Sequence, residues 1–156
     1  IMALFCLHRH FKWVAKESLF RIPFLGWSMS LAGYIKLARG RHGSVRKTYE
    51  EAQRWLRSGV SVFFFPEGTR SRTGQLGPFK NGAFKLSLDT GVPLVPIAIE
   101  GTRDILSRGS WVFSPRSHVR MTVLRPLDPA QYAHDDADQF RDATRQLIQA
   151  ALEEPS

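Results

Sequence analysis

The chain has 156 residues and a mass of 17.7 kDa, and 43% of its residues are apolar and 23% charged. These values fit one globular domain and argue against a disordered chain or a fibrous repeat. The net charge of +8 is uneven, because residues 1–80 hold 14 Lys and Arg against 4 Asp and Glu, and residues 81–156 hold 8 against 10. The basic first half is either a site for an anionic partner, such as a phospholipid headgroup, a phosphorylated substrate or a nucleic acid, or simply a solvated basic surface.

Five elements are predicted before residue 66, from alternation for strands and 3.6-residue spacing for helices. In chain order they are a strand at Phe11–Ala15, a helix from about Pro23 to Gly33, a strand at Tyr34–Ala38, a helix at Ser44–Ser58 and a strand at Val60–Phe65. The strand at 60–65 is apolar almost throughout, which is typical of a central parallel strand covered on both faces.

The helix at 44–58 has the clearest pattern. Ser44 is placed to cap its start and Gly59 to end it. Its apolar residues recur at helical spacing, at Val45, Tyr49, Ala52 and Leu56.

Four elements are predicted after a Gly- and Pro-rich loop that begins at Pro66. They are a helix at Ala83–Asp89, a strand at Val92–Glu100, a strand at His118–Leu124 and a final helix that begins at Asp135 or Asp136. The final helix has one apolar face, formed by Phe140, Leu147, Ile148 and Ala151. Pro96 inside a predicted strand indicates an edge, a bulge or a specialised site. The alternation of strands and helices predicts an α/β fold with a mostly parallel central sheet and helices on both faces.

The stretch FFFPEGTRS at Phe63–Ser71 places polar groups at the end of the apolar strand, where ligands bind in parallel sheets. Gly68 allows a sharp turn or a close approach to a ligand, and Arg70 offers a planar set of donors that matches phosphate oxygens. The loop is not a nucleotide-type phosphate loop, because no Gly-Lys-Ser/Thr follows at the required spacing. The alternative is an exposed turn with an ion pair between Glu67 and Arg70.

A second basic group, Arg39, follows the strand at Tyr34–Ala38. If that strand neighbours the strand at 60–65, Arg39 and Arg70 converge on one anion. Otherwise Arg39 is a surface charge.

Four segments in order, GYIKLARG, FFFPEGTRS, PFKNGAF and GVPLVPIAIEGT, resemble the glycerolipid acyltransferases, most of all the 1-acylglycerol-3-phosphate acyltransferases. FKWVAKESLFRIPFLGW resembles the family's preceding segment, so the resemblance covers about residues 11–102. It implies a glycerolphosphate acyltransferase-like fold, and one acyltransferase domain over residues 1–156 that is incomplete at its N-terminus.

The resemblance also implies roles for individual residues. Glu67, Gly68, Thr69 and Arg70 would bind the acyl acceptor, with Arg70 on its phosphate and Glu67 near its glycerol hydroxyls. Arg39 would be a second phosphate contact, although the family often has Asp before this Arg and this chain has Ala38. Lys80 would give electrostatic support, and Pro96 would shape the site or its acyl-binding side.

The family's catalytic base is a His in a His-x4-Asp block, and no such block is found in this chain. Five positions after its histidines stand Trp13, Ala15, Lys47, Val123 and Gln139. We therefore assign no catalytic residue here, expect the block upstream of Ile1 and predict that the chain alone is inactive. A natural, catalytically dead relative is the alternative.

The resemblance implies a set of partners and a location. The acceptor is a lysophospholipid, the acyl donor is acyl-CoA or acyl carrier protein, and the scheme needs no cofactor and no metal. The location is the cytoplasmic face of the cell membrane, which a reducing compartment for the lone Cys6 would fit. A non-catalytic module that binds anionic lipid or phosphate is the alternative function. A nucleic-acid partner is not expected, because no groove-reading motif is found.

Overall fold

The computed structural model describes residues 10–38, 42–69, 71, 73–102 and 118–153. The chain forms two compact units, which meet in the sequence between Phe65 and Pro66. The described part of the first unit runs from His10 to Phe65, and that of the second unit from Pro66 to Glu153.

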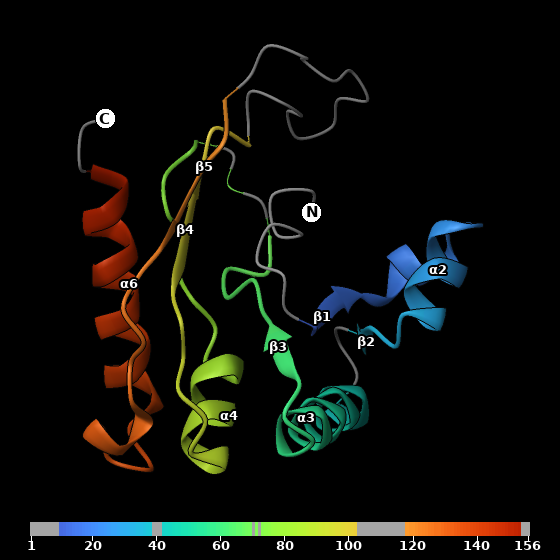
Figure 1. Ribbon diagram of the computed structural model, residues 1–156, viewed down its shortest axis with the longest axis horizontal. Helices are drawn as coiled ribbons and strands as arrows, with labels where there is room; N and C mark the ends of the chain where they lie inside the picture. Colours follow the sequence, from blue (N-terminus) through green and yellow to red (C-terminus); the bar gives the residue numbers. More distant parts are fainter. Residues whose placement is uncertain (1–9, 39–41, 70, 72, 103–117, 154–156) are drawn as a thin grey trace. The chain divides into compact units, whose positions relative to one another are not determined.

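The first unit is built on a parallel three-stranded sheet (Figure 1). Strand β1 (Phe11–Lys16) lies between β2 (Ile35–Leu37) and β3 (Ser61–Phe63). Helix α3 (His42–Arg57) links β2 to β3 and contacts both strands. This arrangement confirms the predicted α/β class with parallel strands, because a parallel pair needs such a crossover.

Helix α3 packs on the sheet through small side chains near its middle. Ala52 is fully buried, and the buried Thr48 donates its hydroxyl to the Lys36 carbonyl oxygen at 2.6 Å, which ties α3 to β2. Gly59 ends the helix in a left-handed conformation (φ 79°), as predicted. The predicted start at Ser44 is wrong, because α3 begins at His42. Val45 does not contribute to the apolar face, since it is 52% exposed.

The connection from β1 to β2 differs from the single helix predicted from about Pro23. It consists of a 3-10 helix η1 (Glu17–Arg21) and a short helix α2 (Leu25–Leu31). The predicted end at Gly33 is confirmed, because Gly33 takes a left-handed conformation (φ 67°) after the last turn. Within the described ranges, no helix combines the length and the apolar character needed to span a bilayer.

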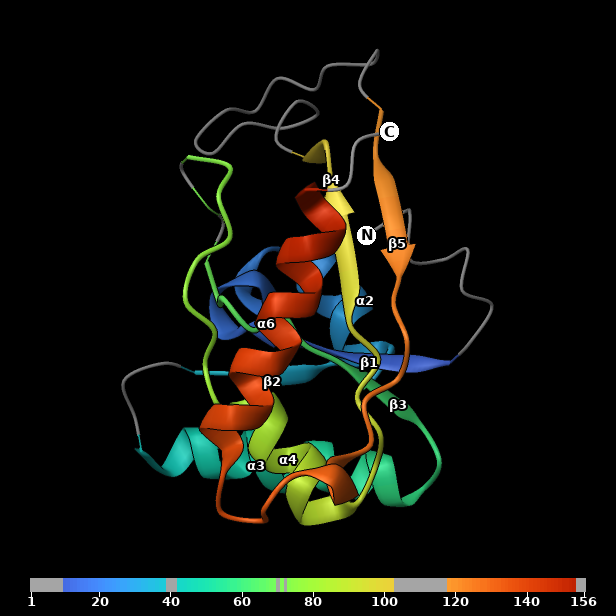
Figure 2. The ribbon, with the colours of Figure 1, turned by 90° about the vertical axis from the view of Figure 1, so that its left-hand side faces the viewer.

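The second unit contains helix α4 (Gly82–Thr90), strands β4 (Ile97–Glu100) and β5 (Arg120–Val123), a 3-10 helix η2 (Pro129–Gln131) and helix α6 (Ala137–Glu153). Strands β4 and β5 pair antiparallel, and α6 runs alongside β4 (Figure 2). The strand predicted from Val92 begins only at Ile97. Pro96 explains the difference, because proline has no N–H to donate to the ladder.

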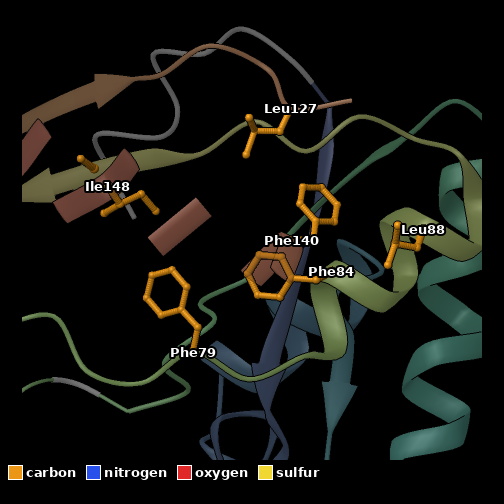
Figure 3. Close-up of a cluster of buried hydrophobic side chains, with 7 residues drawn as sticks. Phe79, Phe84, Leu88, Leu127, Phe140 and Ile148 are labelled. Atoms are coloured by element: carbon orange, nitrogen blue, oxygen red, sulfur yellow. The ribbon is translucent and has the colours of Figure 1, made fainter. Parts of the chain in front are cut away.

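One apolar cluster forms the core of the second unit (Figure 3). Its aromatic residues come from three segments, since Phe79 precedes α4, Phe84 lies in α4 and Phe140 lies in α6. The ring of Phe84 stacks on Phe79 at 6.3 Å and meets Phe140 edge-on at 5.7 Å between centroids. Of the predicted face of the final helix, Phe140 and Ile148 are buried in this cluster, and Leu147 and Ala151 pack against it.

The cap of α6 resolves the choice between two aspartates. The Asp136 carboxylate accepts the backbone N–H of Gln139 at 2.8 Å, so Asp136 rather than Asp135 caps the helix.

Candidate functional site

The loop of residues 66–80 holds most of the predicted site residues, and it lies wholly in the second unit. Its two ends are joined by a hydrogen bond of 2.9 Å from the Lys80 N–H to the Pro66 carbonyl oxygen. Gly68 takes a left-handed conformation (φ 67°), which confirms that the turn after Glu67 needs a glycine.

The carboxylate of Glu67 is directed inward, across the loop. It is half-buried, and its Oε2 accepts the backbone N–H of Gly77 at 2.8 Å. A carboxylate has about four lone-pair positions, so Glu67 retains capacity to accept further hydrogen bonds from a ligand. Glu67 therefore combines a structural contact with an accessible acceptor group.

Gly77 is a residue of this site that sequence reasoning missed. A Cβ at this position would lie 2.8 Å from Glu67 Oε2, closer than real Cβ contacts come. The only sequence signal was the Gly77-Pro78 dipeptide, which marks a turn but does not reveal the neighbouring carboxylate.

Helix α6 contacts the same loop through polar side chains. Arg145 donates from Nη2 to the Leu76 carbonyl oxygen at 3.0 Å and from Nε to the Gly77 carbonyl oxygen at 3.3 Å. Asn81, which follows the loop, bonds to Asp138 at 2.8 Å and accepts from Arg141 at 2.8 Å. These contacts join positions 57 to 69 residues apart, and no local sequence pattern indicated them.

The charges at this end of α6 are paired. Arg141 also bonds to Asp138 and to Asp142. The hydrogen bond with Asp142, followed by attraction to the neighbouring carboxylates, raises the pKa of Arg141 despite some desolvation, and the same bond lowers the pKa of Asp142. Both groups therefore stay charged at neutral pH.

The other predicted site residues of the second unit have different settings. The side chains of Thr69 and Lys80 are exposed and belong to the loop. Pro96 is buried at the start of β4, where its carbonyl oxygen accepts the Leu124 N–H at 2.9 Å. The structure thus brings Glu67, Gly68, Thr69 and Lys80 together in one loop, whereas Pro96 lies outside it.

Arg39 and Arg70 lie outside the described residues, but the strands that precede them are described. The strand order β2-β1-β3 shows that these two strands are not neighbours. The last residue of β2 is opposite Lys16 and the last residue of β3 is opposite Trp13, so the strands end at levels about 10 Å apart. The prediction that Arg39 and Arg70 converge on one anion required these two strands to be neighbours, and they are not.

Two hollows of about 290 and 230 Å³ open on the second unit, beside α6 and η2. Neither is lined by Glu67, Gly68, Thr69, Lys80 or Pro96. In the part of the chain that the structure describes, no group of three or more His, Cys, Asp or Glu side chains is placed to hold a metal ion.

A family model described as Acyltransferase matches residues 1–100, which include β1–β4 and the 66–80 loop. The chain belongs to the acyltransferase family. Among its relatives in this family, the chloroplastic 1-acyl-sn-glycerol-3-phosphate acyltransferase BAT2 of Brassica napus is 41% identical over 127 residues, which are 81% of this chain and 37% of the relative. The 1-acyl-sn-glycerol-3-phosphate acyltransferase of Escherichia coli is 31% identical, over 90% of this chain and 57% of the relative.

A solved acyltransferase structure shares the fold. The 1-acyl-sn-glycerophosphate acyltransferase PlsC from Thermotoga maritima matches with a TM-score of 0.76 and 30% identity, over 91% of this chain and 55% of that chain. This match confirms the fold predicted from the resemblance. The chain spans about half or less of the length of the curated relatives described above, and about half of PlsC.

Proposed function

We propose that this chain is part of a 1-acylglycerol-3-phosphate acyltransferase. The enzyme would move a fatty acyl group from acyl-CoA or acyl carrier protein to the free hydroxyl of 1-acylglycerol-3-phosphate, giving phosphatidic acid for phospholipid synthesis. The observation that carries the proposal is the family match over residues 1–100, which contains the FPEGTRS loop. The names of the plant, bacterial and Thermotoga relatives support the choice of substrate.

We further propose that both units belong to one acyltransferase domain over residues 1–156, incomplete at its N-terminus. The match over residues 1–100 supports this, because it extends across the point where the two units meet.

The 66–80 loop is the proposed acceptor site. Arg70 would bind the acceptor phosphate through its planar set of donors. A second phosphate contact by Arg39 rests on the family resemblance alone, because the strands that precede the two arginines are not neighbours. Glu67 would accept a hydrogen bond from a glycerol hydroxyl, and its fixed position supports this role. The loop also supplies the backbone of Gly68, the hydroxyl of Thr69 and the exposed ammonium of Lys80. Pro96 would shape the site from the start of β4.

The proposed reaction is an acyl transfer from a thioester. The acceptor hydroxyl oxygen bonds to the acyl carbonyl carbon, the carbon–sulfur bond breaks, and the hydroxyl proton ends on the leaving thiol. Binding the acceptor in a fixed orientation would make the bimolecular step effectively unimolecular. Removal of the hydroxyl proton needs a general base. We expect this base to be the His of a His-x4-Asp block upstream of Ile1.

We propose that the protein works at a membrane surface, at the cytoplasmic face of the cell membrane. An exposed apolar segment between residues 19 and 31 supports this location. Its exposed members are Leu19, Ile22, Phe24, Leu25, Trp27 and Leu31. Phe24 is 78% exposed, and its backbone has an unfavourable positive φ of 63°. The exposed side chain of Arg21 pairs with Glu17 at 3.6 Å, so the support for this location comes from the apolar side chains.

The test is acyl transfer by the full-length protein, with Arg70→Ala as the informative variant. Loss of a charge-assisted hydrogen bond to phosphate should raise the activation free energy that corresponds to acceptor kcat/KM by about 1.5–3 kcal/mol. The donor KM should stay unchanged. Free thiol release from an acyl thioester, with and without 1-acylglycerol-3-phosphate, measures both. A wild-type protein that binds the lysolipid and releases no thiol would instead be the non-catalytic lipid-binding relative.

A further inference from the structure

The peptide group between Leu76 and Gly77 lies between two opposite charges. Its carbonyl oxygen accepts from the Arg145 guanidinium at 3.0 Å, and its N–H donates to the Glu67 carboxylate at 2.8 Å. Hydrogen bonds to charged groups are stronger than neutral ones, and bonds in a chain polarise one another. The peptide plane is therefore held from both sides, and its N–H in turn holds the carboxylate of Glu67.

The segment 76–81 is also attached to α6 at its other end, through Asn81. The side chain of Asn81 bonds to Asp138 and Arg141, which lie two turns and one turn before Arg145, respectively, on the same side of α6. Between these two polar attachments, the ring of Phe79 is buried in the core beside α6 (Figure 3). The segment 76–81 is thus bonded to α6 near both ends, and between them Phe79 belongs to the core cluster that also contains Phe140 and Ile148 of α6.

These attachments leave Lys80 in a defined position. Its neighbours Phe79 and Asn81 are both fixed, and its own N–H bonds to the Pro66 carbonyl oxygen at 2.9 Å. Its side chain is exposed. The backbone of Lys80 is therefore held by its own hydrogen bond and by its two neighbours, at the end of the segment away from Arg145.

We propose that Arg145 is a positioning residue for the acceptor site, and that it acts on Glu67 through the peptide group of Leu76 and Gly77. Asp138 and Arg141 hold the other end of the segment through Asn81. This role rests on the proposed function, because it takes Glu67 as an acceptor-binding group. The role makes α6 part of the support of the acceptor site, although α6 lies beyond residues 1–100, which the family model matches.

Two measurements on the full-length protein test this role. The first is amide hydrogen exchange over residues 76–81 in wild type, Arg145→Met, Arg145→Lys and a matched control, Arg125→Met. Arg125 is an exposed arginine of the second unit outside the loop, so its replacement removes the same charge. We expect Arg145→Met to speed the exchange of the Gly77 and Lys80 amides by about tenfold or more, because the hydrogen bonds that protect them loosen. Unchanged exchange in Arg145→Met would overturn the inference.

The second measurement is a double-mutant cycle in the acyl transfer assay. Arg145→Met should lower acceptor kcat/KM about tenfold and leave the donor KM unchanged, and Arg145→Lys should restore part of the loss. Because Arg145 acts through Glu67, adding Arg145→Met to Glu67→Gln should lower kcat/KM little further. Additive losses, or an effect equal to that of Arg125→Met, would contradict the role. If the wild-type protein has no transfer activity, the proposed function is wrong. The hydrogen-exchange experiment would still test whether Arg145 holds the loop in position.

Discussion

Gly77 and Glu67 are in contact, and a Cβ on Gly77 would lie 2.8 Å from Oε2 of the carboxylate. The obstructing atom is the end of a flexible side chain, so Gly77→Ala should be accommodated by rotation of Glu67. We expect a loss of stability of only about 1 kcal/mol, the value of one hydrogen bond, measured by urea unfolding. The larger effect should be on acceptor kcat/KM, because Glu67 would leave its fixed position.

Gly43→Ala is the matched control for this substitution. Gly43 lies in α3, where a Cβ would meet no atom within 4 Å. This change should alter stability by less than about 0.5 kcal/mol, because Gly43 lies in the first turn of α3, outside the helix interior where alanine has its full advantage over glycine. If both Gly77→Ala and Gly43→Ala have the acceptor kcat/KM of wild type, the contact between Gly77 and Glu67 does not matter for the site.

Single residues show which parts of the site the sequence could reveal. Gly68 was predictable, because a tight turn at the end of a strand needs a residue that accepts a positive φ. Gly77 and Arg145 were not, because their partners are distant in the sequence and only the folded chain brings them together. The roles of Arg70 and Arg39 remain predictions from the family resemblance, since both lie outside the described residues.

At the scale of elements, the start of α6 provides a second test. Asp136 accepts the N–H of Gln139, and Asp135 is an exposed neighbour of the same charge. Asp136→Ala should therefore destabilise the protein by about 1 kcal/mol, whereas Asp135→Ala should change stability by less than about 0.5 kcal/mol. Urea unfolding of both variants measures the difference. Equal losses would mean that the helix is not capped by Asp136.

The exposed apolar segment in residues 19–31 provides a third test. Phe24 and Trp27 are 78% and 65% exposed, and their rings meet edge-on at 5.4 Å. If they enter a bilayer, the variant Phe24→Ser with Trp27→Ser should lower binding to vesicles containing phosphatidylglycerol by about tenfold or more, because two aromatic side chains no longer leave water. Co-sedimentation measures this.

Val45→Ser is the control for the vesicle experiment, since Val45 is an exposed apolar residue of α3. Its binding should equal that of wild type. If the double variant also binds as tightly as wild type, the segment does not face the membrane.

The elements differed in how well the sequence predicted them. Gly33 and Gly59 marked the ends of their helices correctly, because a left-handed residue after a helix is a local feature. The start of α3 and the extent of β4 were predicted less well. The pairing of β4 with β5 depends on hydrogen bonds across the sheet, and local propensity does not specify which strand becomes the partner.

At the scale of the whole molecule, the order of predicted strands and helices indicated the α/β class. It did not indicate that the described strands form two sheets, one parallel and one antiparallel. Alternation of strands and helices favours one parallel sheet. The amino-acid sequence between β4 and β5 has no clear pattern, so their antiparallel pairing could not be predicted. The strand order β2-β1-β3 also places β1 between the strands that precede Arg39 and Arg70, which sequence order alone does not indicate.

The last prediction concerns the complete protein. The proposed transfer needs a general base, and none of the five histidines in these 156 residues has an Asp five positions later. We therefore expect the coding sequence upstream of Ile1 to contain the His-x4-Asp block. Replacing its His by Ala should lower kcat by about 10²–10⁴, the usual contribution of general base catalysis, and leave acceptor binding intact. Arg70→Ala should show the opposite pattern, with weaker acceptor binding. A full-length protein that transfers acyl groups without this block would require a different base and would refute the assignment.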